Sequence, residues 1–325
     1  MAERNPFISV VVPTCNRQEP LLKCIESIRA NIYPQYEIIV VDQNSDDAIQ
    51  KKIIGIFNSD EKIVYLHSHI RCSSDSRNRG WRMAKGDIIA FTDDDALVAP
   101  RWLEAYAEAF QQGSANVGMV AGRIEPVFQI PRPSWLPPEK DYLLPSFNAG
   151  NGIKPFPEES LPISVNFALK RSVLENIGGF DVRLGLKKGG KNANIGGEDS
   201  FLAIRVKEAG FPILYQDAAI VYHPVIAKRL NRLFFLTRNF RDGVTTVAIK
   251  NVKHPLTDKE LFSHIKWHSK RILFYSFLFC RDFILPKRGR SRKYMLRAAE
   301  FAFSLGVIIQ AMCLKYKPLK DGECV

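Results

Sequence analysis

Apolar and polar positions alternate in a regular order along the first hundred residues of the chain. Short runs rich in β-branched and aromatic residues, typical of strands, recur at 8–12, 37–41, 62–66 and 87–92. Between them, apolar residues repeat at the spacing of one helix face in the segments 20–31, 48–57 and 74–84. Apolar strands separated by helices predict an α/β fold with a mainly parallel sheet covered on both faces.

Three consecutive carboxylates, Asp93-Asp94-Asp95, follow the last of these strand patterns. Adjacent ionised carboxylates repel one another, so a positive charge has to compensate them. Oxygen ligands of this kind suit Mg²⁺ or Mn²⁺, which proteins hold with one or two carboxylates together with substrate phosphates. Ligands of open α/β sheets bind beyond the carboxyl ends of the strands, which favours a metal site here. The alternative is a solvated acidic turn that caps the next helix.

A second polar cluster follows the strand pattern at 37–41 and is expected at the same edge of the sheet. An acidic residue in this place can accept hydrogen bonds from a nucleotide's base or ribose, and Asp42 is favoured for that role. Asp46 and Asp47 suit the N-cap of the next helix, so an Asx-rich turn is the alternative. Further on, Arg71 and Arg77 lie at the start of a helix, where phosphate binds readily, although a basic surface helix explains them equally well.

Two more candidates occur in the second half of the chain. Glu198 and Asp199 follow two glycines and open a helix, whose N-terminal dipole favours ionised carboxylates. An ionised carboxylate beside an acceptor hydroxyl can act as a general base, and simple helix capping is the alternative. His223 ends an apolar run, where its imidazole suits a Mn²⁺ site or a structural role.

Taken in order, these motifs resemble those of the inverting glycosyltransferases of family 2, which have the GT-A fold. The matching segments are Val10–Arg17, Val41–Asp47, Ser76–Gly80, Gly86–Asp95, Ile177–Asp181, Gly197–Asp199 and Val221–Pro224. The resemblance covers residues 7–224. It implies a GT-A type mixed, mainly parallel sheet flanked by helices, and the chain then continues into a basic helical extension.

The resemblance also implies a role for each motif. Asp199 would be the catalytic base, with Glu198 orienting it or the acceptor, and Asp95, Asp93 and His223 would hold the metal. The residues implied to bind the nucleotide sugar are Pro13, Thr14, Asn16, Arg17, Asp42, Asn44, Arg71, Arg77, Asp93 and Asp94. The residues implied on the acceptor side are Asn166, Gly179 and Phe180.

The implied reaction is a single displacement with inversion. A sugar would pass from a nucleotide-diphosphate donor, a UDP-sugar by default, to a hydroxyl of a saccharide or lipid-linked acceptor in polysaccharide or glycolipid assembly. The loops 125–163 and 185–197, rich in Pro and Gly respectively, are expected to decide the acceptor. A nucleotidyltransferase, which would release pyrophosphate, is the alternative enzyme.

The positive charge of the chain is concentrated at its C-terminal end. Residues 225–325 carry 21 Lys+Arg against 7 Asp+Glu, whereas residues 1–224 carry 25 against 27. This division predicts a catalytic domain over 1–224 and a basic amphipathic helical region over 225–325. Basic and apolar residues alternate at 228–236 and basic residues cluster at 287–293, which suits an anionic membrane surface. The alternative is packing on the catalytic domain or against a second subunit in a homodimer.

Three further observations bear on partners and location. A nucleic-acid-binding protein would also carry such a basic region, but no recognition motif accompanies it and the front domain is acidic, so no nucleic acid is expected. The apolar stretches 272–285 and 301–314 are each shorter than the ~20 residues of a spanning helix. Scattered cysteines and no recognisable signal peptide indicate a cytoplasmic protein, peripheral on the inner face of the cytoplasmic membrane.

Overall fold

The four N-terminal apolar runs form adjacent parallel strands in the computed structural model, which describes residues 5–57, 60–185, 195–284 and 291–316. In sheet order these strands are β3 (Ile63–His67), β2 (Tyr36–Asp42), β1 (Ile8–Thr14) and β4 (Ile88–Phe91). Every residue of β2 and β4 is buried, as expected for parallel strands with helices on both faces.

The second half of the sheet changes direction. Strand β8 (Phe167–Lys170) runs antiparallel to both of its neighbours, β4 and β6 (Met119–Phe128). Strand β9 (Ile213–Val225) then pairs parallel with β6. The short strands β5 (Leu97–Val98) and β7 (Ile153–Pro155) each pair antiparallel with β9. The predicted mixed, mainly parallel sheet is confirmed.

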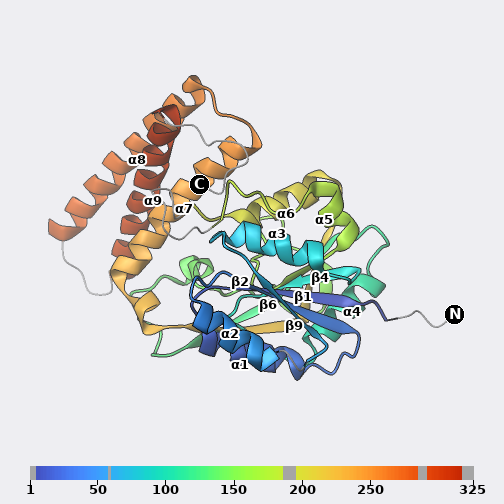
Figure 1. Cartoon of the computed structure of the whole chain (residues 1–325). Coiled ribbons are helices and arrows are strands. Elements are labelled where there is room, and N and C mark those ends of the chain that lie inside the picture. The colour runs from blue at the N-terminus through green and yellow to red at the C-terminus, as the bar shows by residue number, and fades with distance from the viewer. Residues whose placement is uncertain (1–4, 58–59, 186–194, 285–290, 317–325) are drawn as a thin grey trace.

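Helices cover both faces of this sheet (Figure 1). One face packs against α1 (Gln18–Arg29), α2 (Asp47–Phe57) and α4 (Trp102–Gln112). The other packs against α3 (Ser73–Met83), α5 (Arg171–Ile177) and α6 (Glu198–Glu208). Two apolar cores result, one on each side, and the loops after β1, β2 and β4 are left at a common edge.

Two segments differ from what the apolar pattern predicts. The runs 213–215 and 218–222 read as separate strands, but both belong to β9, and the pairing with β6 shifts register between Gly122 and Arg123. The Pro-rich segment 125–163 contains the end of β6, the 3-10 helix η1 (Pro138–Leu143) and β7. Most of the Gly-rich loop 185–197 lies outside the described residues, as do the basic residues 287–290.

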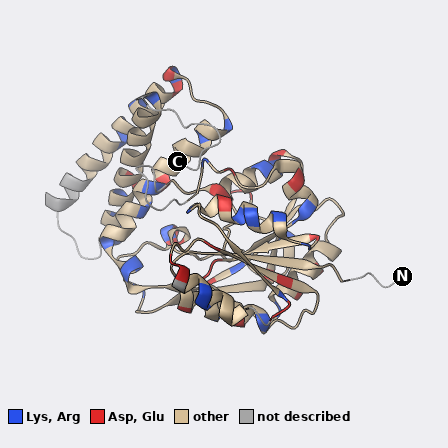
Figure 2. Cartoon of the chain, viewed as in Figure 1, with Lys and Arg blue, Asp and Glu red and all other residues tan. Residues whose placement is uncertain are grey.

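The chain after β9 is helical. A short 3-10 helix η2 (Ala227–Leu230) leads into three long helices, α7 (Arg232–Lys253), α8 (Asp258–Ile284) and α9 (Ser291–Tyr316). Helices α7 and α9 lie in close contact because Gly243 and Gly306 have no side chain. A Cβ at either glycine would collide with a backbone carbonyl of the opposite helix. The predicted basic helical extension is confirmed, and Lys and Arg recur along it (Figure 2).

The alternating basic and apolar residues at 228–236 do not lie on one helix. Leu230 lies in η2 and is buried, whereas α7 begins at Arg232 and leaves Leu233 75% exposed. The break occurs because the Asn231 side chain accepts a hydrogen bond from the Phe234 backbone N–H and caps α7. The apolar residues of this segment are therefore divided: Leu230 and Phe235 are buried, whereas Leu233 faces solvent.

The helical region packs on the sheet through two apolar clusters. One joins Leu136 and Leu143 to Phe235 and Met295, and the other joins Phe201 of α6 to residues of α7. Because β9 continues to Val225 and the clusters cross the boundary, a division into two domains at residue 224 stays a prediction.

Candidate active site

The acidic cluster after β4 is compensated by arginines from two other elements. Arg17, in the loop after β1, donates from Nη1 to Asp94 Oδ1 at 3.0 Å and to Asp95 Oδ2 at 2.7 Å. Arg77, in α3, donates to Asp93 Oδ1 at 2.9 Å. Part of the positive charge that compensates these carboxylates is therefore supplied by the protein itself.

Asp93, Asp95 and His223 nevertheless form a group that fits a divalent metal. One ligand atom from each lies within 4.8 Å of the others. His223 Nε2 is 3.4 Å from Asp95 Oδ1, while its Nδ1 is 3.0 Å from the Pro224 carbonyl, which orients the ring. Two carboxylates and one imidazole are a donor set that suits Mn²⁺. The three residues thus meet as the sequence predicted, and their metal role stays a prediction.

Asp94 and Asp95 have opposite electrostatic environments. Burial raises the pKa of Asp94 to about 6, against the opposing effect of Arg17 and the Thr14 hydroxyl. Burial also disfavours ionisation of Asp95, but His223, Arg17 and Arg229 outweigh it and lower its pKa to about 2. Asp95 is therefore an ionised ligand candidate, while Asp94 is held by Thr14 Oγ1 at 2.7 Å and by Arg17.

Arg77 connects the acidic cluster to the predicted catalytic pair. Its Nη1 is 3.1 Å from Glu198 Oε1, and Ser73 Oγ donates to the same oxygen at 2.8 Å. Burial, and after it the charge of Asp199, raise the pKa of Glu198. One guanidinium thus contacts both Asp93 and Glu198, which come from elements more than a hundred residues apart.

Asp199 follows Glu198 at the start of α6. The preceding Gly197 has φ 89°, a left-handed conformation that favours glycine, and this turn directs the first residues of α6 toward the edge of the sheet. Asp199 Oδ1 accepts from the Ser200 backbone N–H at 2.8 Å, and Oδ2 accepts from that of Ser164 at 3.2 Å. Both bonds orient the carboxylate and involve backbone groups only.

The predicted nucleotide loop is tied to the end of β2. Asn16 has φ 57°, and its backbone N–H donates to Asn44 Oδ1 at 2.7 Å. Asp42 is fully buried, and its oxygens accept from the Asn44 backbone at 2.9 Å and from Tyr65 Oη at 2.8 Å. Asp42 therefore fixes the position of Asn44, which in turn holds the loop at Asn16. Its predicted contact with the base stays a prediction.

Three other predicted binding residues, Arg71, Thr14 and Arg77, are hydrogen-bonded within the protein. Arg71 donates to Ser45 Oγ at 2.5 Å at the exposed edge of this loop. Pro13 and Thr14 end β1, where Thr14 bonds Asp94. Arg77 is 4% exposed, so its guanidinium bonds carboxylates in place of the predicted diphosphate in this structure.

The three residues predicted on the acceptor side are buried or constrained. Asn166 is 1% exposed, with its amide bonded to Trp102, Tyr106 and two backbone carbonyls, so it joins α4, β6 and β9 in the core. Phe180 is buried, with Arg77 5.7 Å from its ring centroid. Gly179 has φ 76° and leaves room for Trp81. Their predicted acceptor role stays untested, and their contacts are structural.

Arg229 belongs to this site and was not predicted there. Burial lowers its pKa, while the neighbouring carboxylates Asp95 and Asp93 oppose that effect. The sequence pattern places it with Lys228 and Arg232 in the basic segment expected to face a membrane. Its position six residues after His223, in η2 directly after β9, was the available signal.

Comparisons with known proteins agree with this geometry. Residues 9–178 match the family model described as "Glycosyl transferase family 2". A relative in Haloferax volcanii, a glucosyl-dolichyl phosphate glucuronosyltransferase, is 25% identical over 262 residues, covering 80% of this chain and 82% of that protein. A second, the GalNAc(5)-diNAcBac-PP-undecaprenol beta-1,3-glucosyltransferase of Campylobacter jejuni, is 32% identical over 114 residues, 34% of this chain and 37% of its own.

A solved structure shows the same fold. The mannosyltransferase PcManGT from Pyrobaculum calidifontis, in complex with GDP-Man and Mn²⁺, superposes with a TM-score of 0.58 over 99% of this chain and 89% of its own, at 17% identity. The family match spans more than half of the chain and includes the strands that carry the acidic cluster. This chain therefore belongs to glycosyl transferase family 2 and is a glycosyltransferase with the GT-A fold.

Proposed function

We propose that this enzyme transfers a sugar from a nucleotide-diphosphate donor to a hydroxyl of a saccharide or lipid-linked acceptor, with inversion. The observation that carries the proposal is the contact of Arg77 with both Asp93 and Glu198. It joins the candidate metal group to Glu198, the residue that directly precedes the candidate base Asp199, in one continuous polar site. A UDP-sugar is the first donor to test.

The residues divide into a donor side and an acceptor side. Asp93, Asp95 and His223 would hold Mn²⁺ or Mg²⁺, which when bound neutralises charge on the leaving diphosphate. Arg17 and Arg229 place two further cations beside these carboxylates. They suit the diphosphate that a nucleotide sugar brings to the same place.

On the acceptor side, Asp199 takes the proton of the attacking hydroxyl. As the acceptor oxygen bonds to the anomeric carbon, the bond from that carbon to the diphosphate breaks in line, so the configuration inverts. Backbone N–H groups of Ser164 and Ser200 keep the Asp199 carboxylate in one orientation. Glu198, fixed by Arg77 and Ser73, positions the start of α6.

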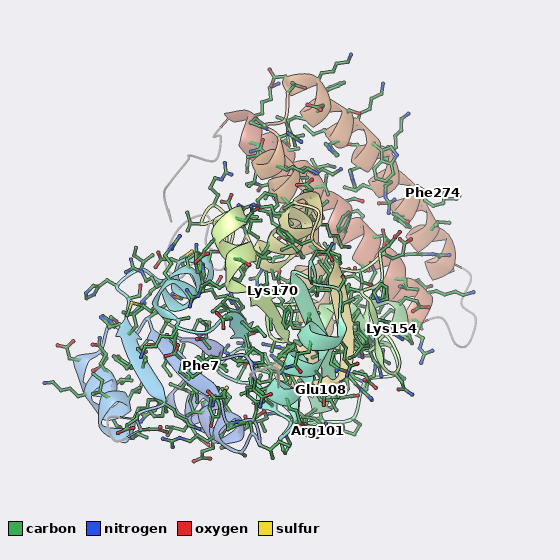
Figure 3. The ribbon with its side chains drawn as sticks, turned by 90° about the vertical axis from the view of Figure 1, so that its right-hand side faces the viewer. Phe7, Arg101, Glu108, Lys154, Lys170 and Phe274 are labelled. Atoms are coloured by element: carbon green, nitrogen blue, oxygen red, sulfur yellow. The ribbon has the colours of Figure 1, made fainter. Side chains whose placement is uncertain are left out.

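The acceptor is proposed to reach the site from a membrane surface. On α8, Phe262, Leu273 and Phe277 are 65%, 71% and 65% exposed. The exposed Lys266 and Lys270 lie between them on the same helix face. Phe274 lies on the side of α8 turned away from the sheet (Figure 3). Aromatic and basic residues mixed on one outward face suit an anionic bilayer surface.

We also propose that the enzyme lies at the cytoplasmic side of a membrane, and two further observations support the membrane location itself. Two relatives carry dolichyl phosphate and undecaprenol in their names. Among the described residues, the segment Arg292–Lys315 of α9 has the length and apolarity of a membrane-crossing helix. It packs against both α7 and α8, so we propose peripheral attachment through α8 in preference to a crossing.

A donor screen tests the proposed function. The full chain is incubated with UDP-, GDP- and dTDP-sugars and Mn²⁺, with and without EDTA, and the released nucleotide is identified by chromatography. We expect slow metal-dependent release of one nucleoside diphosphate, because water can replace the acceptor hydroxyl. Release of pyrophosphate would contradict glycosyl transfer, and release unaffected by EDTA would contradict the metal site.

A further inference from the structure

A large apolar cavity lies between the three C-terminal helices. Its volume is ≈ 660 Å³, within the range of about 300–1,000 Å³ typical of small-molecule sites. The residues that line it include Leu236, Phe240, Tyr275, Phe301, Ala302 and Leu305. An open apolar cavity of this size exposes hydrocarbon surface to water unless a ligand covers it.

A smaller basic pocket adjoins this cavity along α7. Its volume is ≈ 180 Å³, and it is lined by Lys228, Arg238 and Arg241, with Thr237 shared by both pockets. Within the described part of the chain, no ion pair engages any of these three cations. Asp242 is the nearest carboxylate on α7; burial raises its pKa, and Arg238 acts on it in the opposite direction.

The basic pocket adjoins the part of the chain that contributes to the active site. Lys228, which lines the pocket, lies in η2 next to Arg229. Strand β9, which carries His223, ends two residues before η2 begins. The pocket therefore follows directly on the strand that supplies one of the candidate metal ligands.

We propose that the two pockets together hold a single-chain lipid phosphate, the carrier of the sugar acceptor. Its phosphate lies against Lys228, Arg238 and Arg241, because guanidinium groups bind phosphate through several charge-assisted hydrogen bonds. Its hydrocarbon chain fills the cavity between α7, α8 and α9. The inference rests on the proposed function and names the acceptor class that this function requires.

Because the basic pocket and the apolar cavity adjoin, a lipid phosphate can occupy both, whereas a simpler ligand can occupy only one. A free phosphate would use the cations and leave the apolar cavity empty, and an uncharged alcohol would do the reverse. The outward face of α8, which carries Phe274 and Phe277, is separate from the cavity and suits the bilayer itself. The cavity can thus hold the hydrocarbon chain of one lipid molecule that has left the bilayer.

Calorimetry on the full chain with three soluble probes tests the proposal. The probes are farnesyl phosphate, farnesol and inorganic phosphate, used below micelle-forming concentration at fixed ionic strength. We expect farnesyl phosphate to bind about tenfold or more tightly than either other probe, because it alone fills both pockets. Equal binding of inorganic phosphate or of farnesol would overturn the proposal.

Variants locate the binding. Arg238→Gln should weaken farnesyl phosphate about tenfold, and Arg238→Lys should restore most of the affinity. Ala302→Phe, which fills the cavity, should weaken farnesyl phosphate and leave inorganic phosphate unchanged. Lys250→Gln is the matched control, since Lys250 is an exposed cation on α7 outside both pockets, and it should bind like the wild type. Melting temperatures show whether each variant is folded.

The remaining outcomes identify other occupants. If Arg238→Gln reduces sedimentation with phosphatidylglycerol vesicles but not farnesyl phosphate binding, the pocket contacts bilayer headgroups and the proposal is wrong. If Ala302→Phe converts a dimer to a monomer in light scattering, a second copy covers the cavity and the proposal is equally wrong. A wild type that binds farnesyl phosphate but hydrolyses no nucleotide sugar separates failure of the proposed function from failure of this inference.

Discussion

Arg77 and Glu198 form a buried ion pair with an Nη1–Oε1 distance of 3.1 Å, and their side chains are only 5% and 9% exposed. Arg77 bonds Asp93 with its other terminal nitrogen at 2.9 Å. Charges so removed from water are stabilised chiefly by each other. Loss of Arg77 would leave the Glu198 carboxylate buried beside Asp199 without a compensating cation.

Arg77→Met is therefore expected to destabilise the fold by about 3–5 kcal/mol. Glu198→Gln added to it should recover part of that loss, because it removes the uncompensated charge. The free energy of unfolding from urea titration measures both effects. Arg79→Met is the control on the same helix, since its pair with Asp75 is partly exposed and is expected to contribute under about 1 kcal/mol. Equal losses for the two arginine variants would contradict the role given to Arg77.

Asp199→Asn is expected to abolish transfer while nucleotide-sugar binding is retained. The amide cannot take the acceptor's proton, and general bases contribute typically about 10²–10⁴-fold to rate. Turnover and donor affinity are measured separately, by product formation and by calorimetry. Glu208→Gln, at the exposed end of the same helix, is the control for charge loss. Turnover within a few-fold of the wild type in Asp199→Asn would reject Asp199 as the base.

Asp95→Asn and His223→Ala are each expected to weaken Mn²⁺ binding by about tenfold or more, because each removes one of three ligands. Asp94→Asn removes the same charge from the same turn, but Thr14 and Arg17 already hold that carboxylate. Its effect on Mn²⁺ affinity should be clearly smaller. Calorimetric titration or the free Mn²⁺ signal in electron paramagnetic resonance gives the affinities. The same loss in all three variants would show a general charge effect without a defined site.

Much of the fold followed from local pattern, because the N-terminal strands and helices are each defined by their own apolar spacing. The candidate metal group could also be predicted, since Asp93 and Asp95 follow β4 and His223 lies near the end of β9 in the same sheet. Family membership then fixed the reaction class as glycosyl transfer, which replaces the nucleotidyltransferase alternative.

What could not be predicted depends on contacts between distant segments. The spacing of residues marks Arg77 as a helix-terminal cation, but its burial arises because α3 meets both the loop after β4 and the start of α6 through Asp93 and Glu198. Arg229 was missed for the same reason, because only the folded chain brings it near Asp95 and Asp93. Nothing in the sequence around Asn166 indicates that its side chain accepts hydrogen bonds from Trp102 and Tyr106.

The outward face of α8 yields a prediction about membrane attachment. The double variant Leu273→Ser/Phe277→Ser should bind phosphatidylglycerol vesicles about tenfold or more weakly in co-sedimentation. Each substitution removes the free energy gained when an apolar side chain enters the membrane interface. Ile32→Ser is the control, because Ile32 is 60% exposed on the opposite part of the molecule, after α1. Reduction of the binding by high salt would show the share of Lys266 and Lys270. Unchanged sedimentation of the double variant would remove α8 as the attachment face.

His268 makes the helical region sensitive to acid. Its ring is 6% exposed, and its pKa is lowered to about 4, first by burial and then by Arg271, His264 and Lys250, with Glu300 opposing. In the unfolded chain an imidazole titrates near 6.5. Between these two values the unfolded state binds a proton that the folded state does not, so stability falls as the pH decreases from about 6.5 toward 4.

Replacement of His268 should remove that part of the acid sensitivity. His268→Leu keeps most of the side-chain volume and contributes no proton, so the fall in melting temperature between pH 7 and pH 5 should be smaller than in the wild type. His254→Gln is the control, because His254 is exposed at the end of α7 and should leave the wild-type slope unchanged. Scanning calorimetry at several pH values gives the slopes. A buried, neutral imidazole predicts a difference between the two dependences of melting temperature on pH. Identical slopes for His268→Leu and the wild type would therefore contradict this role of His268.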